Sequence, residues 1–444
     1  MKSVYKFLIR KKLAHARQLI AQRSKLVGRE SIERYQVTRF NEVWQDARRH
    51  VPFYANWQKT FCLPDMIESL SDLQAWPVLT KADLRCLDKF VRDDCPEPAG
   101  RIMTGGSTGE PLRLPSWGDA NDGAAQIVGR WAYGVGPGSR TFLLWGHRHL
   151  YGTGFKRRIT IVKRAVKDWL AGWRRVSAYD LGAMAMRRAY RKMARFRPEF
   201  VIGFSAAVLA FCRQNADRAG QIHGVKVVLC SAGPLTDSEI SEIETFFSAK
   251  VCMEYGSVEC AVMAYTNPED GWYDVFWNTH LLQAVRQPDG EYKNIVTRLS
   301  HDYIPLIRYD VGDYLDLGIS DTKELLCAER SLLRMRRVKG RPTEMITFAC
   351  GVSFFGALIG DCVKQVDKVI ASQMVVDEDS NVLEIRVTAR SPLTSEDQSL
   401  ILNRLQLTVD DAYKLNVRIN VVDELEMTVG GKVPRVIRRR TAQK

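Results

Sequence analysis

Residues 225–259, VKVVLCSAGPLTDSEISEIETFFSAKVCMEYGSVE, decide the fold class of this chain. The apolar runs at 225–230 and 250–255 predict two strands, and residues 237–247 between them have the apolar spacing of a helix. Each strand runs into a turn that contains small residues, 231–234 and 256–259. Strands that alternate with helices predict an α/β domain with a largely parallel sheet, whose ligands bind at the carboxyl ends of the strands.

The same alternation continues towards the N-terminus. Strands are predicted at 141–145 and 200–204, and helices at 119–131, 181–196 and 206–215. Residues 1–50 are predicted to be helical, ending before Pro52, because the residue that precedes a proline is pushed out of the helical region. Thr80 is predicted to cap a further helix.

The pattern changes after residue 272. Strand-like pieces at 281–286 and 294–299, separated by turns such as 288–290, predict a β-rich subdomain. The basic segment 337–342 contains a glycine and a proline and is typical of a domain boundary. After it, two strands (372–376 and 383–388) and a helix (395–413) predict a small α+β domain. We therefore expect a large N-terminal domain, 1–339, and a small C-terminal one, 340–444.

The main candidate for ligand binding is MTGGSTGEP, residues 103–111. Its glycines let a backbone pass close to a ligand. Consecutive backbone N–H groups with flanking hydroxyls make a cradle for an anion such as a nucleotide phosphate. A flexible surface turn is the alternative for this stretch alone. Neither a Gly-Lys-Ser/Thr ending nor a G-x-G-x-x-G spacing is present, which excludes two common nucleotide loops.

Composition indicates a globular protein that works in a reducing compartment. The chain has 444 residues, of which 45% are hydrophobic and 26% are charged. Its 10 cysteines include no C-x-x-C pair, so neither a structural zinc site nor a disulfide framework is expected. No apolar run has the length of a membrane span, and no signal peptide is recognisable. A cytoplasmic location fits these features best.

A net charge of +14 favours anionic partners. Much of it lies in residues 1–26, 156–175 and 435–444, for which solvated helix faces are the plain interpretation. Residues 1–26 form a basic amphipathic segment that could also make a peripheral contact with the anionic inner face of a membrane. No RNA-binding aromatic signature and no zinc finger is present, so nucleic acid is not expected as a partner.

Six segments, in this order, resemble the motifs of the adenylate-forming (acyl-AMP) superfamily: Thr104–Pro111, Ser231–Pro234, Tyr255–Glu259, Arg308–Asp313, Gly340–Arg341 and Gly431–Lys432. The moderate length and residues 79–84 and 305–309 resemble the phenylacetate–coenzyme A ligase branch, which includes coenzyme F390 synthetase and capsular-polysaccharide proteins. Thr343 stands where the family's interdomain hinge carries an aspartate. Cys260 and His280 alone do not make the tetrahedral metal site of some members.

The resemblance implies an α/β adenylation domain with a mobile lid, and two half-reactions. A carboxylate attacks the α-phosphate of ATP, and an acceptor then displaces AMP from the acyl-AMP. The implied cofactors are ATP and Mg²⁺, with coenzyme A as the leading acceptor and an amine or alcohol of an amino acid or sugar as the alternative. A non-catalytic nucleotide-binding or membrane-associated scaffold is the competing hypothesis from another class of protein.

The resemblance also implies a role for each matching residue. The phosphates would be held by Thr104, Gly105, Gly106, Ser107, Thr108 and Gly109, and the adenine side would be formed by Ser231, Ala232, Gly233, Pro234, Tyr255, Gly256 and Ser257. Glu259 would bind Mg²⁺, because that hard cation prefers carboxylate oxygens. Asp313 would bind the ribose, Arg341 the ribose or phosphate, and Lys432 would be the catalytic cation. His147, Trp145 and His280 are candidates for the acyl pocket. Arg308 is open to either an ion pair or a ligand contact.

Overall fold

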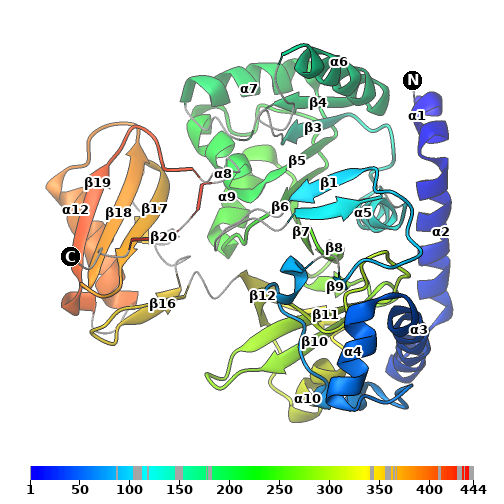
Figure 1. Ribbon diagram of the computed structural model, residues 1–444. Coiled ribbons are helices and arrows are strands. Elements are labelled where there is room, and N and C mark those ends of the chain that lie inside the picture. Colours follow the sequence, from blue (N-terminus) through cyan, green and yellow to red (C-terminus); the bar gives the residue numbers. More distant parts are fainter. Residues whose placement is uncertain are drawn as a thin grey trace.

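The computed structural model describes residues 2–86, 89–103, 113–117, 120–145, 154–176, 178, 183–340, 345–355, 362–363, 366, 368–408, 412–427, 433–434 and 436–439. A large N-terminal part contains an eight-stranded and a four-stranded sheet, and the C-terminal part has a four-stranded sheet of its own (Figure 1). In the described chain, no helix is both long and apolar enough to cross a membrane.

The eight-stranded sheet confirms the predicted α/β class. Its strands, in spatial order, are β13 (Arg334–Met335), β9 (Tyr273–Val275), β8 (Ala261–Thr266), β7 (Lys250–Ser257), β6 (Val227–Ser231), β5 (Phe200–Phe204), β3 (Thr141–Leu144) and β4 (Trp173–Val176). From β4 to β7 the neighbours are parallel, whereas β7, β8, β9 and β13 pair antiparallel.

Helices bury both faces of the parallel part of this sheet. They are α5 (Ala120–Ala132), α7 (Ala183–Phe196), α8 (Ser205–Gln214) and α9 (Asp237–Phe247), while α6 (Gly154–Ala171) contacts the edge strand β4. Alternate strand residues serve two cores: Val201 and Val228 join the core that holds Phe211 of α8, while Ile202 and Leu229 join the one that holds Ala125 of α5. Burial on both faces explains why these strands are continuous apolar runs in the sequence.

The predicted β-rich subdomain is an antiparallel sheet in the order β10 (His280–Arg286), β11 (Tyr292–Arg298), β12 (Tyr309–Asp316) and β14 (Arg337–Gly340). Helix α10 (Thr322–Arg330) packs on β10. The basic segment at 337–342 therefore begins as a strand, which pairs with β12. Near the glycine-rich stretch, β1 (Gly100–Met103) and β2 (Arg113–Ser116) pair antiparallel, with Met103 opposite Arg113.

The first fifty residues are helical, as predicted, in α1 (Lys2–Leu8), α2 (Arg10–Lys25) and α3 (Arg29–His50). Pro52 opens α4 (Pro52–Phe61), where its missing N–H is not needed. Helix α2 packs on α5, and Leu19 lies in a small core with Ala124. The helix predicted after Thr80 is only a 3₁₀ turn, η2 (Asp83–Arg85), and a second such turn, η1 (Leu70–Ala75), precedes it.

The C-terminal part has its own core and a sheet in the order β19 (Asn416–Val421), β18 (Val382–Ala389), β17 (Val369–Asp377) and β20 (Val436–Arg438). Helix α12 (Ser395–Thr408) covers it, and β15 (Met345–Thr347) pairs with β16 (Ser353–Phe355). The described part of α12 begins at the predicted Ser395 and runs to Thr408, beyond which residues 409–411 lie outside the described ranges; β19 and β20 were not predicted. This part contacts α8, where Arg213 Nη1 lies 3.4 Å from the Ile370 carbonyl oxygen.

Candidate active site

The carboxyl ends of three parallel strands meet at one edge of the large sheet. Leu144 pairs with Gly203 and Phe204 pairs with Ser231, so β3, β5 and β6 end almost level. Trp145, directly after β3, packs against Phe204 with 4.3 Å between ring centroids. The structure thus brings a predicted acyl-pocket residue and the predicted adenine-side loop to the same edge, where open α/β sheets bind ligands.

The loop that begins at Ser231 is held in a conformation that side chains rarely adopt. Ala232 has φ +64°, in the left-handed region. The Ser205 hydroxyl, buried at the start of α8, lies 2.7 Å from the Gly233 carbonyl oxygen and 3.2 Å from that of Ser231. Ser205 therefore fixes the loop that follows β6. Ser205 was not predicted as a site residue, although a serine between a strand and a helix is typical of a helix start.

A tight hairpin between β7 and β8 carries Glu259. A Cβ on Gly256 would lie 2.4 Å from the Ala261 carbonyl oxygen, closer than real contacts allow, so the hairpin requires glycine there. The register shifts at Gly256, which marks a β-bulge. Ser257 Oγ accepts the Cys260 backbone N–H at 2.9 Å and closes the turn. The turn thereby sets the direction of the Glu259 side chain.

Glu259 is a buried carboxylate without a cationic partner in the described part of the chain. Glu259 is only 8% exposed, and its Oε1 accepts a hydrogen bond from the Tyr309 hydroxyl at 3.1 Å. Arg298 is near, but its Nη1 lies 3.4 Å from the Glu259 backbone oxygen, and its Nε pairs with Asp302 at 2.8 Å. Buried charges are normally paired or bind metal. The chemistry of Glu259 therefore fits the predicted Mg²⁺ ligand.

A second tyrosine–carboxylate pair links the same two sheets in the opposite direction. Tyr255 of β7 donates its hydroxyl to Asp313 Oδ2 of β12 at 3.0 Å, and Asn294 Nδ2 donates to the Tyr255 oxygen at 2.8 Å. Burial raises the pKa of the Tyr255 hydroxyl well above its usual range, with the charge of Asp313 adding to the shift, so it remains a donor. Tyr255 and Tyr309 thus hold both predicted carboxylates, and neither Tyr309 nor Asn294 was assigned a role from the sequence.

His280 is bound within the protein at both ring nitrogens. Its Nε2 lies 2.7 Å from the Cys260 carbonyl oxygen, and Nδ1 lies 2.9 Å from the Thr279 hydroxyl. Burial, and to a lesser extent Arg298, lowers the pKa of His280 to about 3, so the ring is neutral at ordinary pH. These contacts favour a role in holding the Glu259 turn over the acyl-pocket role expected from the sequence.

Arg308 is a buried cation that forms no ion pair with any described carboxylate. It is 3% exposed, its Nη1 donates to Gln283 Oε1 at 3.0 Å, and burial lowers its pKa to about 10. The ion pair considered from the sequence is therefore not seen. Several predicted site residues lie outside the described ranges: Thr104, Gly105, Gly106, Ser107, Thr108, Gly109, His147, Arg341, Thr343 and Lys432.

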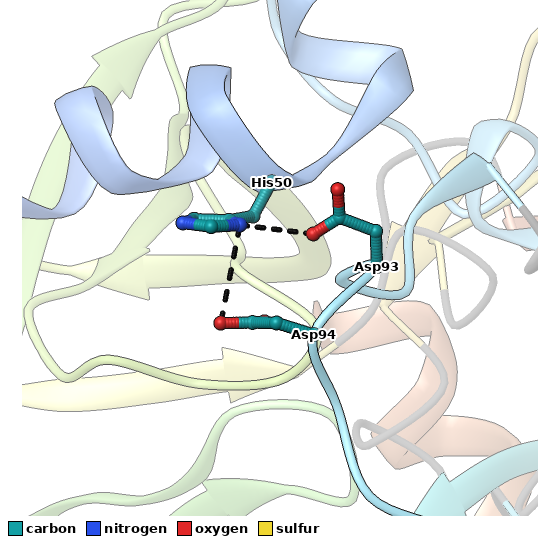
Figure 2. A group of neighbouring side chains, drawn as sticks. All are labelled: His50, Asp93 and Asp94. Carbon is teal, nitrogen blue, oxygen red and sulfur yellow. Dashed lines mark hydrogen bonds and ion pairs between the residues drawn. The ribbon is translucent and has the colours of Figure 1, made fainter.

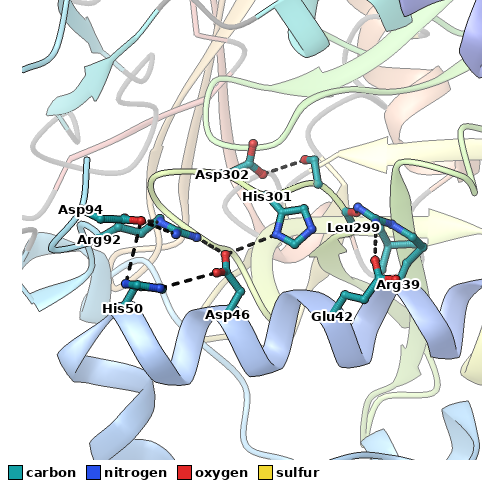
Figure 3. Close-up of polar contacts among 10 residues, drawn as sticks. Arg39, Glu42, Asp46, His50, Arg92, Asp94, Leu299, His301 and Asp302 are labelled. Carbon is teal, nitrogen blue, oxygen red and sulfur yellow. Dashed lines mark hydrogen bonds and ion pairs between the residues drawn. The ribbon is translucent and has the colours of Figure 1, made fainter. Parts of the chain in front are cut away.

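A polar cluster behind the site anchors the loop that carries Asp302. Asp46 of α3 ion-pairs with Arg92 and lies 3.3 Å from His301 Nδ1, as Figure 3 shows. His50, Asp93 and Asp94 form a group whose spacing could hold a metal ion (Figure 2). However, Arg92 already makes two 2.7 Å hydrogen bonds to Asp94 and lowers the pKa of that carboxyl to about 2. We therefore interpret this cluster as an ion-pair network.

The comparisons with known proteins agree with this geometry. No known family profile matches the chain. It is 22% identical to Protein CapK of Staphylococcus aureus over 411 residues, which is 89% of this chain and 86% of CapK. It is 24% identical to the phenylacetate–coenzyme A ligase of Escherichia coli (strain K12) over 351 residues, 73% of this chain and 74% of that protein.

Among solved structures, the fold matches 2-hydroxyisobutyryl-CoA ligase in the postadenylation state in complex with 2-HIB-AMP. The TM-score is 0.70 at 16% identity, over 92% of this chain and 89% of that one. That likeness confirms the predicted fold, including its C-terminal α+β part. The relatives above carry the names expected from the sequence motifs, and they support the resemblance of this chain to the phenylacetate–coenzyme A ligase branch of the adenylate-forming superfamily.

Proposed function

We propose that this protein is an ATP-dependent, AMP-forming ligase that activates a carboxylic acid as acyl-AMP and passes the acyl group to an acceptor. The observation that carries the proposal is the Glu259 carboxylate, which is buried, accepts a hydrogen bond from Tyr309 and has no counter-charge among the described residues. A fold keeps such an uncompensated charge where a ligand completes it. The scaffold hypothesis provides no reason to retain it.

The described residues have distinct tasks in this proposal. Asp313, oriented by Tyr255, accepts hydrogen bonds from the ribose hydroxyls, and the Ser231–Pro234 loop borders the adenine. Mg²⁺ held by Glu259 would neutralise phosphate charge, the main need in nucleotidyl transfer. The assignments to Thr104–Gly109, Arg341 and Lys432 rest on the sequence motifs. We place the ATP and acid site in residues 1–339 and the lid that carries Lys432 in residues 340–444.

Coenzyme A is the acceptor that we propose first. The ligases similar to this chain in sequence or in fold are named for coenzyme A thioesters, whereas the name of CapK specifies no acceptor. An amine or hydroxyl acceptor is the second candidate, and CapK is the observation that favours keeping it. The 10 free cysteines agree with the cytoplasmic location that we propose.

Pyrophosphate release with ATP and Mg²⁺ across a panel of carboxylic acids tests the proposal. Each acid is assayed with coenzyme A, with hydroxylamine and without acceptor. Turnover that needs coenzyme A identifies a thioester product, and turnover only with hydroxylamine indicates an amine or alcohol acceptor. If the protein binds ATP but releases no pyrophosphate with any acid, the scaffold hypothesis replaces the proposal.

A further inference from the structure

Helix α6 turns an apolar stripe towards solvent. Ile159, Val162, Val166 and Trp169 are 40%, 61%, 51% and 61% exposed. Steps of three, four and three residues place all four side chains on one side of a helix. A surface helix of a globular domain normally turns such a stripe to the core, whereas these side chains of α6 are exposed, as is Ile161 (43%) on another side of the helix.

Cations border this stripe. Arg158, Lys163, Arg164 and Lys167 are exposed, and none of them forms an ion pair in the described part of the chain. Asp168 is the only acid in the α6 sequence, and it is buried and paired with Arg175 of β4, with 3.0 Å between Oδ2 and Nε. The outer surface of α6 therefore combines exposed aliphatic and indole groups with uncompensated positive charge.

Helix α1 lies next to α6 (Figure 1). Tyr5 anchors α1 by packing edge-on against Trp173 at 6.0 Å between ring centroids. Phe7 and Leu8 of α1 are 63% and 62% exposed. By contrast, α2 buries Leu19 against α5, although Ile20 of the same helix is 40% exposed.

We propose that α6, together with Phe7 and Leu8 of α1, docks on the surface of an anionic lipid membrane. Apolar side chains enter the acyl boundary while flanking Lys and Arg meet lipid phosphates, the combination typical of interfacial helices. A second copy of the chain fits poorly, because two α6 helices would bring their cations together without acids between them. Nucleic acid would use the cations but leave the aliphatic stripe exposed to water. The proposal is independent of the ligase activity.

Vesicle flotation of the full chain tests it, with phosphatidylcholine vesicles and with phosphatidylcholine–phosphatidylglycerol vesicles. One variant, Val162→Ser/Val166→Ser/Trp169→Ala, removes apolar groups, and another, Lys163→Gln/Arg164→Gln/Lys167→Gln, removes charge. We expect the natural chain to float with anionic vesicles only, and each variant to partition roughly a hundredfold less. The control Arg187→Gln/Arg191→Gln/Lys192→Gln removes the same charge from exposed positions of α7 and should float like the natural chain.

Equal loss in the α7 control would mean that net charge alone drives binding, and would overturn the assignment to α6. Undiminished flotation of the apolar variant would overturn it as well. Light scattering measures the molar mass of the same proteins in solution. A natural chain that is dimeric and an apolar variant that is monomeric would show that a second copy covers α6, and would overturn the membrane proposal. Circular dichroism verifies that each variant is folded.

Discussion

The Glu259 hairpin and helix α6 each leave a physical demand unmet, in opposite ways. At the hairpin, the Glu259 carboxylate is buried with no counter-charge in the part of the chain that the structure describes; on α6, apolar side chains are exposed to solvent. Burying a charge without a partner lowers the free energy of unfolding by roughly one to several kcal/mol. An exposed aliphatic group lowers it by almost nothing, because the group is exposed in the unfolded chain as well. The first region should therefore trade stability for function, and the second should not.

The largest expected effect follows from Glu259→Gln. Without the carboxylate, acid-dependent pyrophosphate release should fall about a hundredfold or more, because the site loses its ligand for Mg²⁺. Removing the uncompensated charge should at the same time raise the free energy of unfolding by about 1 kcal/mol. Asp302→Asn is the control, since it removes one ion-pair partner of the buried Arg298 and should lower the free energy of unfolding by about 3 kcal/mol. A lower free energy of unfolding for Glu259→Gln than for the natural chain would show that the buried carboxylate does not reduce stability.

Gly256→Ala should disturb the hairpin itself. The new Cβ would meet the Ala261 carbonyl oxygen at 2.4 Å, and main chain must shift to relieve the contact. We expect a loss of about 1–3 kcal/mol in the free energy of unfolding, measured in urea, and reduced pyrophosphate release because Glu259 moves. Gly100→Ala, at a position with open space, should be close to neutral. Equal stability of the two variants would show that the hairpin tolerates a side chain.

The buried His280, which holds the Glu259 turn, should make folding stability depend on pH. Its pKa is about 3 in the folded protein and about 6.5 when unfolded. Between these values the unfolded state binds the proton, so folding stability is full above about pH 6.5 and declines as pH falls towards 3, by at most about 1.4 kcal/mol per pH unit. In urea unfolding between about pH 4 and pH 7, the free energy of unfolding of His280→Gln should fall less with decreasing pH than that of the natural chain. An unchanged slope would assign the acid sensitivity to other groups.

The smallest expected effect concerns α6. Val162→Ser should change the free energy of unfolding by no more than about 0.5 kcal/mol and leave pyrophosphate release unchanged. Met193→Ala on α7, where the side chain is fully buried, should cost about 2–5 kcal/mol. Both are measured by urea unfolding. If Val162→Ser were as costly as Met193→Ala, the α6 stripe would be part of the core and the membrane proposal would fail.

Much of the fold could be predicted because its signals are local. Helix α9 has its predicted bounds, since Thr236 and Glu239 form a capping box and Ser248 ends the helix in a left-handed conformation. Strand β19 was missed although its Asn-Val-Arg-Ile-Asn-Val alternation is a strand signal. Helix α12 begins at its predicted residue, Ser395.

By itself, the sequence determined the alternation of strands and helices between residues 181 and 255 and the motif residues at the strand ends. Only the tertiary structure decided which side chains form hydrogen bonds with each other. Tyr255 and Asp313 are 58 residues apart, and Tyr309 and Glu259 are 50 apart, so their pairing depends on how two sheets meet. Likewise, spacing places Val162 and Trp169 on one side of α6, but only the folded structure shows that these side chains are exposed. Periodicity acts over a few residues, whereas packing is a property of the whole chain.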